Sequence, residues 1–450
     1  MVTNIPERRV VIMGAAGRDF HNFNVLYRDD PAMRVIAFTS AQIPGIGGRR
    51  YPPELAGAGY PDGIPIIDEE ALEMICRRER IDQVDFAYSD VTQEYVMHAA
   101  SRAMSAGASF HIAGPKQTEL QASVPVIAIC AVRTGCGKSQ TTRYLSHHLA
   151  EKGLRVAVIR HPMPYGDLAR QAVQRFASRA DLDAADCTIE EREEYEPHIA
   201  NGSVVFAGVD YAAILAEAEA KVDVILWDGG NNDFSFIKPD VMITLVDALR
   251  PEHLTTHHPG ETTLRLADIV IIAKSDAAET AQINALEKRL GGLLPGRPIV
   301  RAASPVVLDN PDAVKGKRVL IVEDGPTITH GGMPWGAGYR AVSALPGVTL
   351  VDPRTHAQPE IKKVFDAYPH IGPVLPAMGY GAEQLAALQA TINATPADVV
   401  VVATPVDLAA RITVKQPVVR AHYRYDDFGQ PRLSALIDTR LSALGLASNG

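Results

Sequence analysis

Short unbroken runs of apolar residues alternate with amphipathic stretches along almost the whole chain. The run at 126–129 is unbroken, and the predicted strands at 154–160 and 222–227 are mainly apolar with one or two charged residues. All three are rich in valine and isoleucine, which is typical of strands covered on both faces. Between them, apolar residues recur at helical spacing, for example over 144–149. This alternation predicts an α/β protein of several domains, with parallel sheets that carry helices on both faces.

The strand at 126–129 leads directly into a glycine-containing loop and then into a helix. The loop carries the pattern GxGKS at 135–139, in which backbone N–H groups turn toward an anion and the lysine reaches the β- and γ-phosphates. Val132 stands where the full pattern has glycine, so a glycine-rich turn with a surface lysine is the alternative. The predicted nucleotide contacts are Arg133, Thr134, Gly135, Cys136, Gly137, Lys138, Ser139 and Gln140.

Another apolar strand, 222–227, ends in Asp228, downstream of the loop. This is the Walker-B arrangement, in which the carboxylate binds Mg²⁺ directly or through water. We predict Ser139 and Asp228 as metal ligands, with Asp233 as the alternative. Asn231 or Asn232 would orient an attacking group. The predicted catalytic residues are Lys138, Arg160, Asp228 and Asn231.

A strand at 268–273 is followed by Lys274 and Asp276. In nucleotide-binding domains a Lys-x-Asp sequence at this place reads the base, because the lysine stem packs on the ring and the aspartate accepts N–H groups of guanine. We therefore predict that Lys274 and Asp276 contact the nucleotide. Ala273 stands where guanine-binding domains carry asparagine, so the choice between ATP and GTP stays open.

Cationic side chains occupy several segments predicted as loops or strand ends, where ligands bind in parallel sheets. Segment 42–60 is long, irregular and rich in glycine and proline, and such loops are usually functional. We therefore expect a small anionic metabolite as substrate. The predicted substrate-binding residues are Arg18, Arg49, Arg50, His161 and Arg250. Gly14 and Gly17 form a Rossmann-like turn that either binds a phosphate-bearing ligand or only permits close packing.

Three other segments leave alternatives open. His253, His257 and His258 suggest a metal site, an anion contact or plain surface, and His253 and His257 would share a face if the segment were helical. Segment 188–198 is dense in charge and is predicted to be a solvated helix or loop, with a substrate or metal role for Glu194 and Glu196 as the alternative. The glycine-rich stretch 315–342 predicts an anion site or a long structural crossover.

Length and composition limit the classes of protein. A chain of 450 residues is too long for one core. We expect a Rossmann-like domain over 1–122, a P-loop NTPase domain over 123–297 and a C-terminal α/β domain over 298–450. The net charge of −9 argues against nucleic acid as a partner, and four scattered cysteines indicate neither disulfides nor zinc.

Signal-peptide and membrane-spanning patterns are lacking in the sequence, so no membrane partner is expected and the expected location is the cytoplasm. Large α/β enzymes of several domains are often symmetric dimers, so a homodimer is expected as well.

Four stretches together resemble the cyclic 2,3-diphosphoglycerate synthetase family, whose members are also described as predicted GTPases. These stretches are VVIMGAAGRDFHNFN, the phosphate loop, WDGGNND and EDGPTITHGG, and the resemblance runs over most of the chain. It implies an enzyme that uses ATP and Mg²⁺ to close 2,3-diphosphoglycerate into a cyclic anhydride, with release of ADP and phosphate. It places Gly135, Gly137, Lys138 and Ser139 on the nucleotide and Asp228 on the metal.

The sequence thus favours an Mg²⁺-dependent, NTP-hydrolysing ligase or cyclase that acts on a small anionic metabolite. Anhydride closure or ligation needs mainly positioning and charge neutralisation, which the loop, Asp228 and the arginines supply. The alternative is a regulatory or metallochaperone-type GTPase, which the Lys-x-Asp sequence and the histidine cluster favour. A nucleotide-binding scaffold without turnover is the third option.

Overall fold

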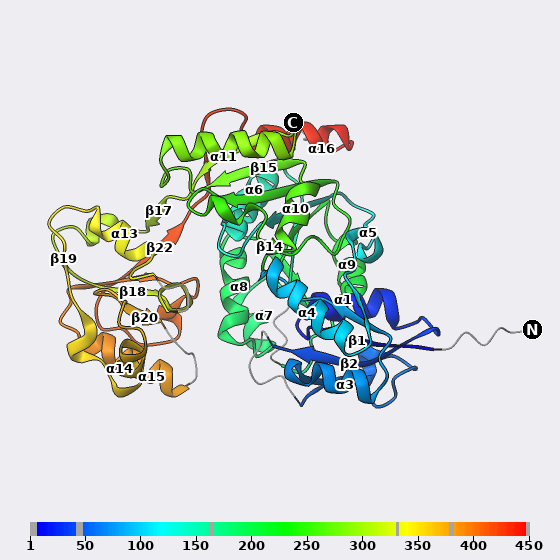
Figure 1. Cartoon of the computed structure of the whole chain (residues 1–450). Coiled ribbons are helices and arrows are strands. Elements are labelled where there is room, and N and C mark those ends of the chain that lie inside the picture. Colours follow the sequence, from blue (N-terminus) through cyan, green and yellow to red (C-terminus); the bar gives the residue numbers. More distant parts are fainter. Residues whose placement is uncertain (1–6, 42–47, 162–165, 330–332, 378–381, 447–450) are drawn as a thin grey trace, which may run out of the picture. The chain divides into compact units, whose positions relative to one another are not determined.

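The computed structural model describes residues 7–41, 48–161, 166–329, 333–377 and 382–446, in which strands and helices alternate. Figure 1 shows the elements along the chain. The chain divides into two compact units: the first comprises residues 1–186, 198–303 and 427–450, and the second comprises 187–197 and 304–426. The division falls inside helix α8 (Ile189–Ala200). The predicted domain boundaries at 122 and 297 stay predictions.

The first unit contains a sheet built from the N-terminal part of the chain, in the strand order β3-β4-β2-β1-β5-β7. Its strands are β1 (Arg8–Met13), β2 (Met33–Ser40), β3 (Arg50–Tyr51), β4 (Ile64–Asp68), β5 (Gln83–Phe86) and β7 (Ser109–His111). Neighbouring strands of this sheet pair in parallel, except β3 with β4, which are antiparallel. Val10 and Ile12 of β1 join one apolar cluster and Val11 and Met13 join another, so helices cover both faces of the sheet.

The helices around this first sheet are short. They are α1 (Arg18–Asn22) with a π-helical turn at Phe23–Tyr27, α2 (Pro53–Ala56), α3 (Leu72–Arg78), α4 (Gln93–Ser105) and α5 (Pro115–Thr118). The segment at 42–60, predicted to be irregular, contains β3 and α2. Its residues 42–47 lie outside the described part of the chain.

A larger sheet of the same unit carries the phosphate loop, and its strand order is β10-β11-β9-β12-β8-β13-β15-β16-β23. The strands are β8 (Val126–Ala131), β9 (Val156–Arg160), β10 (Gln174–Phe176), β11 (Val204–Ala207), β12 (Val224–Asp228), β13 (Val241–Asp247), β15 (Ile269–Ala273), β16 (Ile299–Ala303) and β23 (Asp426–Asp427). From β11 to β16 the pairing is parallel, and β8 is buried throughout. Because β8 lies between β12 and β13, the loop that follows it adjoins the ends of both neighbours.

The helices of this part are α6 (Lys138–Glu151), α7 (Arg179–Ala184), α9 (Tyr211–Glu219), α10 (Gly260–Leu266), α11 (Thr280–Leu293) and α16 (Leu433–Ala443). A two-stranded antiparallel ladder joins the two sheet regions, because β14 (His257–His258) pairs with β6 (Val91–Thr92). Backbone hydrogen bonds in this separate ladder therefore link a segment that follows β5 of the N-terminal sheet to a segment that follows β13 of the phosphate-loop sheet.

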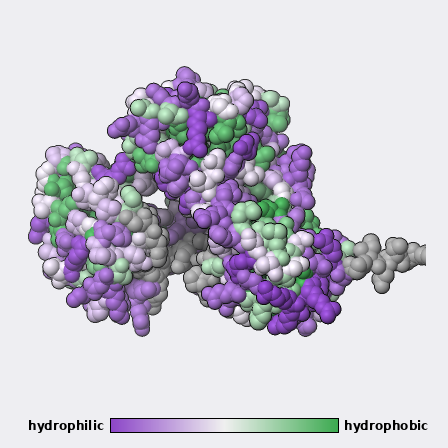
Figure 2. All heavy atoms as spheres, viewed as in Figure 1, coloured by the Kyte–Doolittle hydropathy of each residue, from purple (hydrophilic) through white to green (hydrophobic). Residues whose placement is uncertain are grey.

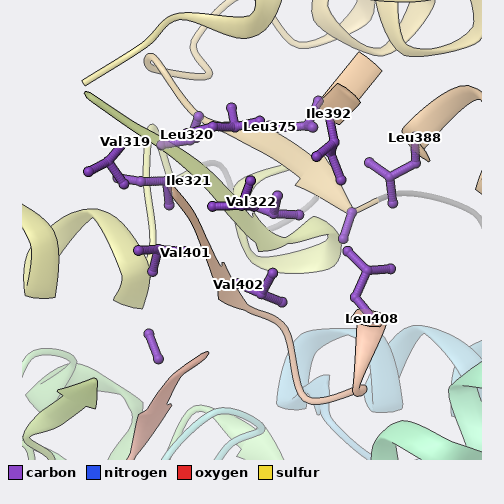
Figure 3. Close-up of a cluster of buried hydrophobic side chains, with 14 of the residues drawn as sticks. Val319, Leu320, Ile321, Val322, Leu375, Leu388, Ile392, Val401, Val402 and Leu408 are labelled. Carbon is purple, nitrogen blue, oxygen red and sulfur yellow. The ribbon is translucent and has the colours of Figure 1, made fainter. Parts of the chain in front are cut away.

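The second unit has its own sheet, in the order β17-β22-β21-β18-β19, with β20 also paired to β18. Its elements are β17 (Val306–Leu308), β18 (Arg318–Asp324), α12 (Gly325–Ile328), α13 (Ala337–Ser343), β19 (Thr349–Leu350), α14 (Pro359–Ala367), β20 (Leu375–Ala377), α15 (Ala382–Ala394), β21 (Val399–Ala403) and β22 (Val418–Tyr423). Figure 3 shows Val319, Ile321, Val401 and Leu388 in its apolar core. The stretch 315–342 thus contains a strand and two helices rather than one long crossover, apart from residues 330–332, which are not described.

Hydrophilic residues predominate on the face shown in Figure 2, with small apolar areas between them. Within the described ranges, none of the helices has the length and apolar character needed to cross a membrane. Helix α8 departs from the prediction for 188–198, because Glu191, Arg192, Glu196 and His198 are all at least nine-tenths buried. The prediction of a solvated segment is therefore wrong.

Candidate nucleotide site

The phosphate loop adopts a backbone that only glycine takes readily. Gly135 and Gly137 have φ of 81° and 103°, and a Cβ on Gly137 would stand 2.5 Å from Nε2 of Gln140. Lys138 is the first residue of α6, and its Nζ donates to the carbonyl of Asn231. The loop therefore leads from the carboxyl end of β8 directly into the N-terminus of α6, the arrangement that a phosphate site requires.

Neighbouring strands hold the loop in place from one side. Asp247, at the end of β13, accepts from Lys274 Nζ at 2.7 Å and from Arg250 Nε at 2.8 Å. Arg250 also donates to the carbonyl of Thr134 at 3.0 Å. Burial alone would raise the pKa of Asp247, but the charges of Lys274 and Arg250 outweigh burial and lower it. The predicted roles of Lys274 and Asp276 toward the base, and of Arg250 toward substrate, stay predictions.

Asp228 lies in a fully buried cluster on the other side of the loop. Its Oδ2 is 2.5 Å from Arg160 Nη1 and 3.0 Å from His198 Nε2, and Arg160 Nη1 also donates to Ser139 Oγ at 3.1 Å. Burial by itself would raise the pKa of Asp228, yet Arg160 and His198 outweigh it and hold that pKa below its usual range. Arg143 adds another nearby positive charge. The predicted metal ligands Ser139 and Asp228 therefore come together, with Arg160 between them.

Ser89 and Asp90, in the segment between β5 and β6, complete this side of the site. Ser89 Oγ accepts from Asn231 Nδ2 at 3.1 Å, and the amide of Asp90 donates to Asn232 Oδ1 at 2.8 Å. Asp90 Oδ1 lies 2.7 Å from Arg133 Nε of the phosphate loop. Asp90 and Asn231 both have positive φ, at 58° and 42°, which costs conformational energy and is common at functional sites.

Arg18 and His161 lie where these two regions meet. Arg18 Nε is 2.8 Å from Asp233 Oδ1, and its guanidinium stands 3.7 Å from the ring centroid of Phe234. His161 packs so closely on Gly17 that a Cβ there would be 1.8 Å from its Nε2. Asp233, the alternative metal ligand, is thus paired with Arg18.

The Rossmann-like turn after β1 is filled by the chain itself. Oδ1 of Asp19 accepts from the amides of Ala16, Gly17 and Phe20 at 2.7–3.0 Å. Burial raises the pKa of Asp19 to about 6, although these hydrogen bonds oppose the shift. Because a carboxylate already occupies the amides, the close-packing alternative is favoured over phosphate binding at this turn.

Two predicted substrate residues bind backbone carbonyls. Arg49 donates to the carbonyl of Gly166, in the segment that follows His161. Arg50 donates to the carbonyls of Asp62 and Gly63 beside its own strand pair. Neither contact tests a role toward substrate, which stays a prediction for both.

The three neighbouring histidines do not share a helix face. His253 lies in a 3₁₀ turn (Pro251–Leu254), whereas His257 and His258 form β14. Nε2 of His257 is 2.6 Å from Arg133 Nη1, so this nitrogen accepts and the ring is neutral there. Among the described residues, no group of three or more His, Cys, Asp or Glu side chains is arranged to hold a metal.

Sequence reasoning missed four residues of the site: Ser89, Asp90, Arg143 and His198. One sequence feature could have indicated His198. It ends the charged stretch 188–198, and so many charged residues need ion-pair or hydrogen-bond partners if the segment is buried. The other three sit in ordinary helix or strand-end patterns and carry no such signal.

A phosphate loop between β8 and α6, with Asp228 at the end of the adjacent β12, defines a P-loop protein of the nucleotide-dependent class. The chain is 54% identical to arginine synthetase ArcE of Thermococcus kodakarensis over 432 residues, which are 96% of each chain. It therefore belongs to the ArcE family. This membership and the loop confirm the expectation of an NTP-dependent, ligase-type enzyme. The name of this relative is not that of a cyclic 2,3-diphosphoglycerate synthetase.

Solved structures resemble the chain only distantly. LpxK of Aquifex aeolicus, crystallised with ATP, has a TM-score of 0.44 at 10% identity, over 72% of this chain and 90% of its own. A DUF1611 family protein of Anabaena variabilis has a TM-score of 0.22 at 8% identity, over 66% of this chain and 95% of its own. No family model matches the chain.

Proposed function

We propose that this protein is an Mg²⁺-dependent, ATP-using synthetase whose product is arginine. The observation that carries the proposal is a phosphate loop with Lys138, next to the strand end that carries Asp228, in a chain that matches an arginine synthetase along nearly its whole length. The proposal keeps the sequence-based expectation of phosphoryl transfer coupled to ligation. It differs in the substrate, which is a precursor of arginine instead of 2,3-diphosphoglycerate.

The chemistry of arginine suits such a site. Its guanidinium carbon can be made from a ureido carbon, as in citrulline, if nitrogen replaces the ureido oxygen. The ureido oxygen attacks the γ-phosphorus of ATP, and the bond from that phosphorus to the ADP oxygen breaks. Ammonia then adds to the carbon, the C–O bond breaks, and phosphate leaves with the former ureido oxygen. Both steps depend mainly on positioning and charge neutralisation.

The residues present fit a divalent cation. Asp228 Oδ1 is buried and has no hydrogen-bond partner among the described residues, and Ser139 lies on the other side of Arg160. Ser139 and Asp228 would hold Mg²⁺, which supplies neutralisation of phosphate charge when bound. The loop amides and Lys138 would bind the β- and γ-phosphates.

Positive charge exceeds negative charge around Asp228. Arg143, Arg160 and Lys138 all act electrostatically on its carboxylate. This surplus favours a transferring phosphoryl group, whose charge grows on the equatorial oxygens during transfer. On the N-terminal side, Arg18 is paired with Asp233, and His161 packs against Gly17 and Gly230, two residues beyond Asp228. The acceptor would lie on this side of the site.

The test is product formation by the purified full-length protein. With ATP, Mg²⁺, citrulline and ammonium, we expect ADP and arginine in equal amounts, measured by chromatography. Omission of any one component should abolish both products, and Lys138→Ala provides the catalytically impaired control. ATP turnover that is indifferent to citrulline and ammonium would refute the proposal.

The same assay also tests two other functions. The cation-rich surroundings of Asp228 would also accept a polyphosphorylated acid, so 2,3-diphosphoglycerate belongs in the substrate panel. Turnover with that acid alone would select the cyclase instead. Slow hydrolysis confined to GTP and stimulated by nickel or zinc would select the metallochaperone-type GTPase.

A further inference from the structure

His198 and Arg160 bind the same oxygen of Asp228. His198 Nε2 lies 3.0 Å from Oδ2, and Arg160 Nη1 lies 2.5 Å from it. His198 and Asp228 have no measurable exposure and Arg160 has 4%. Two donors on one carboxylate oxygen fix the rotation of the carboxylate about its Cβ–Cγ bond.

The second oxygen of Asp228 is left unused. Oδ1 is buried and has no hydrogen-bond partner in the described part of the chain. A buried carboxylate oxygen without a donor is costly unless a ligand completes it. Arg160 Nη1 contacts both Oδ2 of this carboxylate and Ser139 Oγ, so Asp228 and Ser139 are near one another. A divalent cation, or water bound to one, is the ligand that would complete Oδ1 beside a serine hydroxyl.

We infer that His198 is a positioning residue that holds Asp228 with Oδ1 presented to the divalent cation. This inference rests on the proposed function, because it needs a metal–nucleotide complex at the phosphate loop. His198 comes from α8, which is not adjacent in sequence to the phosphate loop or to β12. Partners behind a metal ligand commonly set its orientation, and their loss weakens metal binding.

Arg160 alone does not fix the carboxylate in the same way. Its Nη1 is shared between Asp228 Oδ2 and Ser139 Oγ, so a ligand that recruits Ser139 also disturbs Arg160. Within the described part of the chain, Nε2 of His198 has no such competing contact, and its Nδ1 is buried without a partner. His198 is therefore the donor that stays on Oδ2 when the metal site is filled.

The test measures Mn²⁺ binding rather than turnover. Free Mn²⁺ is followed by electron paramagnetic resonance at saturating ADP, in the full-length protein and in three variants. His198→Leu removes the donor and keeps similar volume, His198→Asn is too short to reach Oδ2, and His198→Gln places an amide N–H near the position of Nε2. We expect Mn²⁺ affinity to fall by about 10- to 100-fold in the Leu and Asn variants and to stay within about threefold in the Gln variant.

A second His–Asp pair provides the matched control. His148 of α6 lies outside the site, and its Nε2 is 2.8 Å from Asp438 Oδ1 of α16. His148→Leu should leave Mn²⁺ affinity unchanged. Thermal unfolding without metal or nucleotide shows which variants are folded, and if His198→Leu does not fold, the Asn and Gln variants carry the comparison.

The outcomes separate the two proposals. If the unaltered protein binds no Mn²⁺ with ADP, the proposed function fails. If it binds Mn²⁺ but folded His198→Leu or His198→Asn binds equally well, the role of His198 is refuted. If His198→Gln loses as much affinity as His198→Leu, packing of the imidazole rather than its N–H is what matters, which also overturns the inference.

Discussion

The buried ion pair between Arg18 and Asp233 joins the N-terminal sheet region to the strand end of the site, and its removal should be costly. Nε and Oδ1 are 2.8 Å apart, and the two side chains are 5% and 2% exposed. At an effective dielectric constant of about 20, the attraction at this distance is about 6 kcal/mol before desolvation is subtracted. Breaking a buried pair by removing one partner typically costs about 3–5 kcal/mol, because the other charge stays buried.

We therefore expect Arg18→Met to lower the free energy of unfolding by about 3–5 kcal/mol. This substitution also removes the cation–π contact between the guanidinium and the ring of Phe234, and the expected 3–5 kcal/mol includes that contact. Asp233→Leu should cost a similar amount. The double variant Arg18→Met/Asp233→Leu should recover most of it, since no buried charge is left, so the double-mutant cycle should show strong coupling.

Tryptophan fluorescence in a denaturant titration can isolate the relevant unit. The chain has two tryptophans: Trp227 is fully buried in the first unit, and Trp335 belongs to the second. Trp227 packs 4.9 Å from Phe236, a short distance along the chain from Asp233. In a Trp335→Phe background, the fluorescence transition therefore reports unfolding of the unit that contains the pair.

An exposed pair of the same length is the control. Arg155 and Asp223 are 2.7 Å apart, but Arg155 is 66% exposed. Arg155→Met should cost no more than about 1 kcal/mol. Equal losses for Arg18→Met and Arg155→Met, or additive losses in the double-mutant cycle, would show that burial of the Arg18 pair is not what stabilises this junction.

Three further changes test the site directly. Lys138→Ala should reduce kcat/KM for ATP by at least about 100-fold, because a charged contact to the phosphates is lost, and near-normal turnover would contradict the phosphate-loop assignment. Gly17→Ala should displace His161 and lower activity, since the new Cβ would lie 1.8 Å from Nε2, whereas Gly114→Ala meets nothing within 4 Å and serves as control; equal activity of the two would refute the close packing. Burial raises the pKa of Asp19 from 3.8 to about 6, so the folded state holds this proton more tightly than the unfolded chain. The stabilising contribution of this group is complete well below pH 3.8 and falls by about 3 kcal/mol in all as pH rises through about 6. Between pH 4 and 7 the difference in unfolding free energy between Asp19→Asn and the unaltered chain should therefore change by about 2.4 kcal/mol, and a flat difference would refute it.

The local parts of the site were predictable from sequence, because each rests on consecutive residues. The phosphate loop follows a buried strand and opens a helix, and Asp228 ends another buried strand, so short patterns identify both. Ser89 and Asp90 reach the site only because β6 pairs with β14, a contact between segments more than 150 residues apart. No local periodicity encodes such a pairing, which is why these residues were missed.

Segment 188–198 shows why charge density misleads. Charged residues are rarely buried unless they are paired, so a run of them predicts solvent exposure. Here the partners are supplied within the helix and by other segments: Arg192 lies 3.5 Å from Glu196, Glu191 accepts from the amide of Thr188, and His198 donates to Asp228. The sequence shows the charges but not their partners, and the partners decide burial.

Glycine-rich turns after strands also look alike in sequence while differing in what fills them. Oδ1 of Asp19 occupies the amides of the turn after β1, and Glu323 accepts from the amides of Gly336, Gly338 and Tyr339 at 2.7–3.2 Å. A carboxylate in such a nest takes the place that a phosphate would take, so a ligand would have to displace it. In the phosphate loop, by contrast, no carboxylate in the described part of the chain accepts from the amides of residues 134–138, and Lys138 Nζ donates to the carbonyl of Asn231. Asp19 is two residues from Gly17, whereas Glu323 is 13 residues from Gly336, so no fixed sequence spacing marks a turn whose amides a carboxylate occupies. Only the folded chain shows which glycine-rich turn has amides free of a carboxylate. Among the described residues the phosphate loop is such a turn, and we expect the nucleotide to bind there.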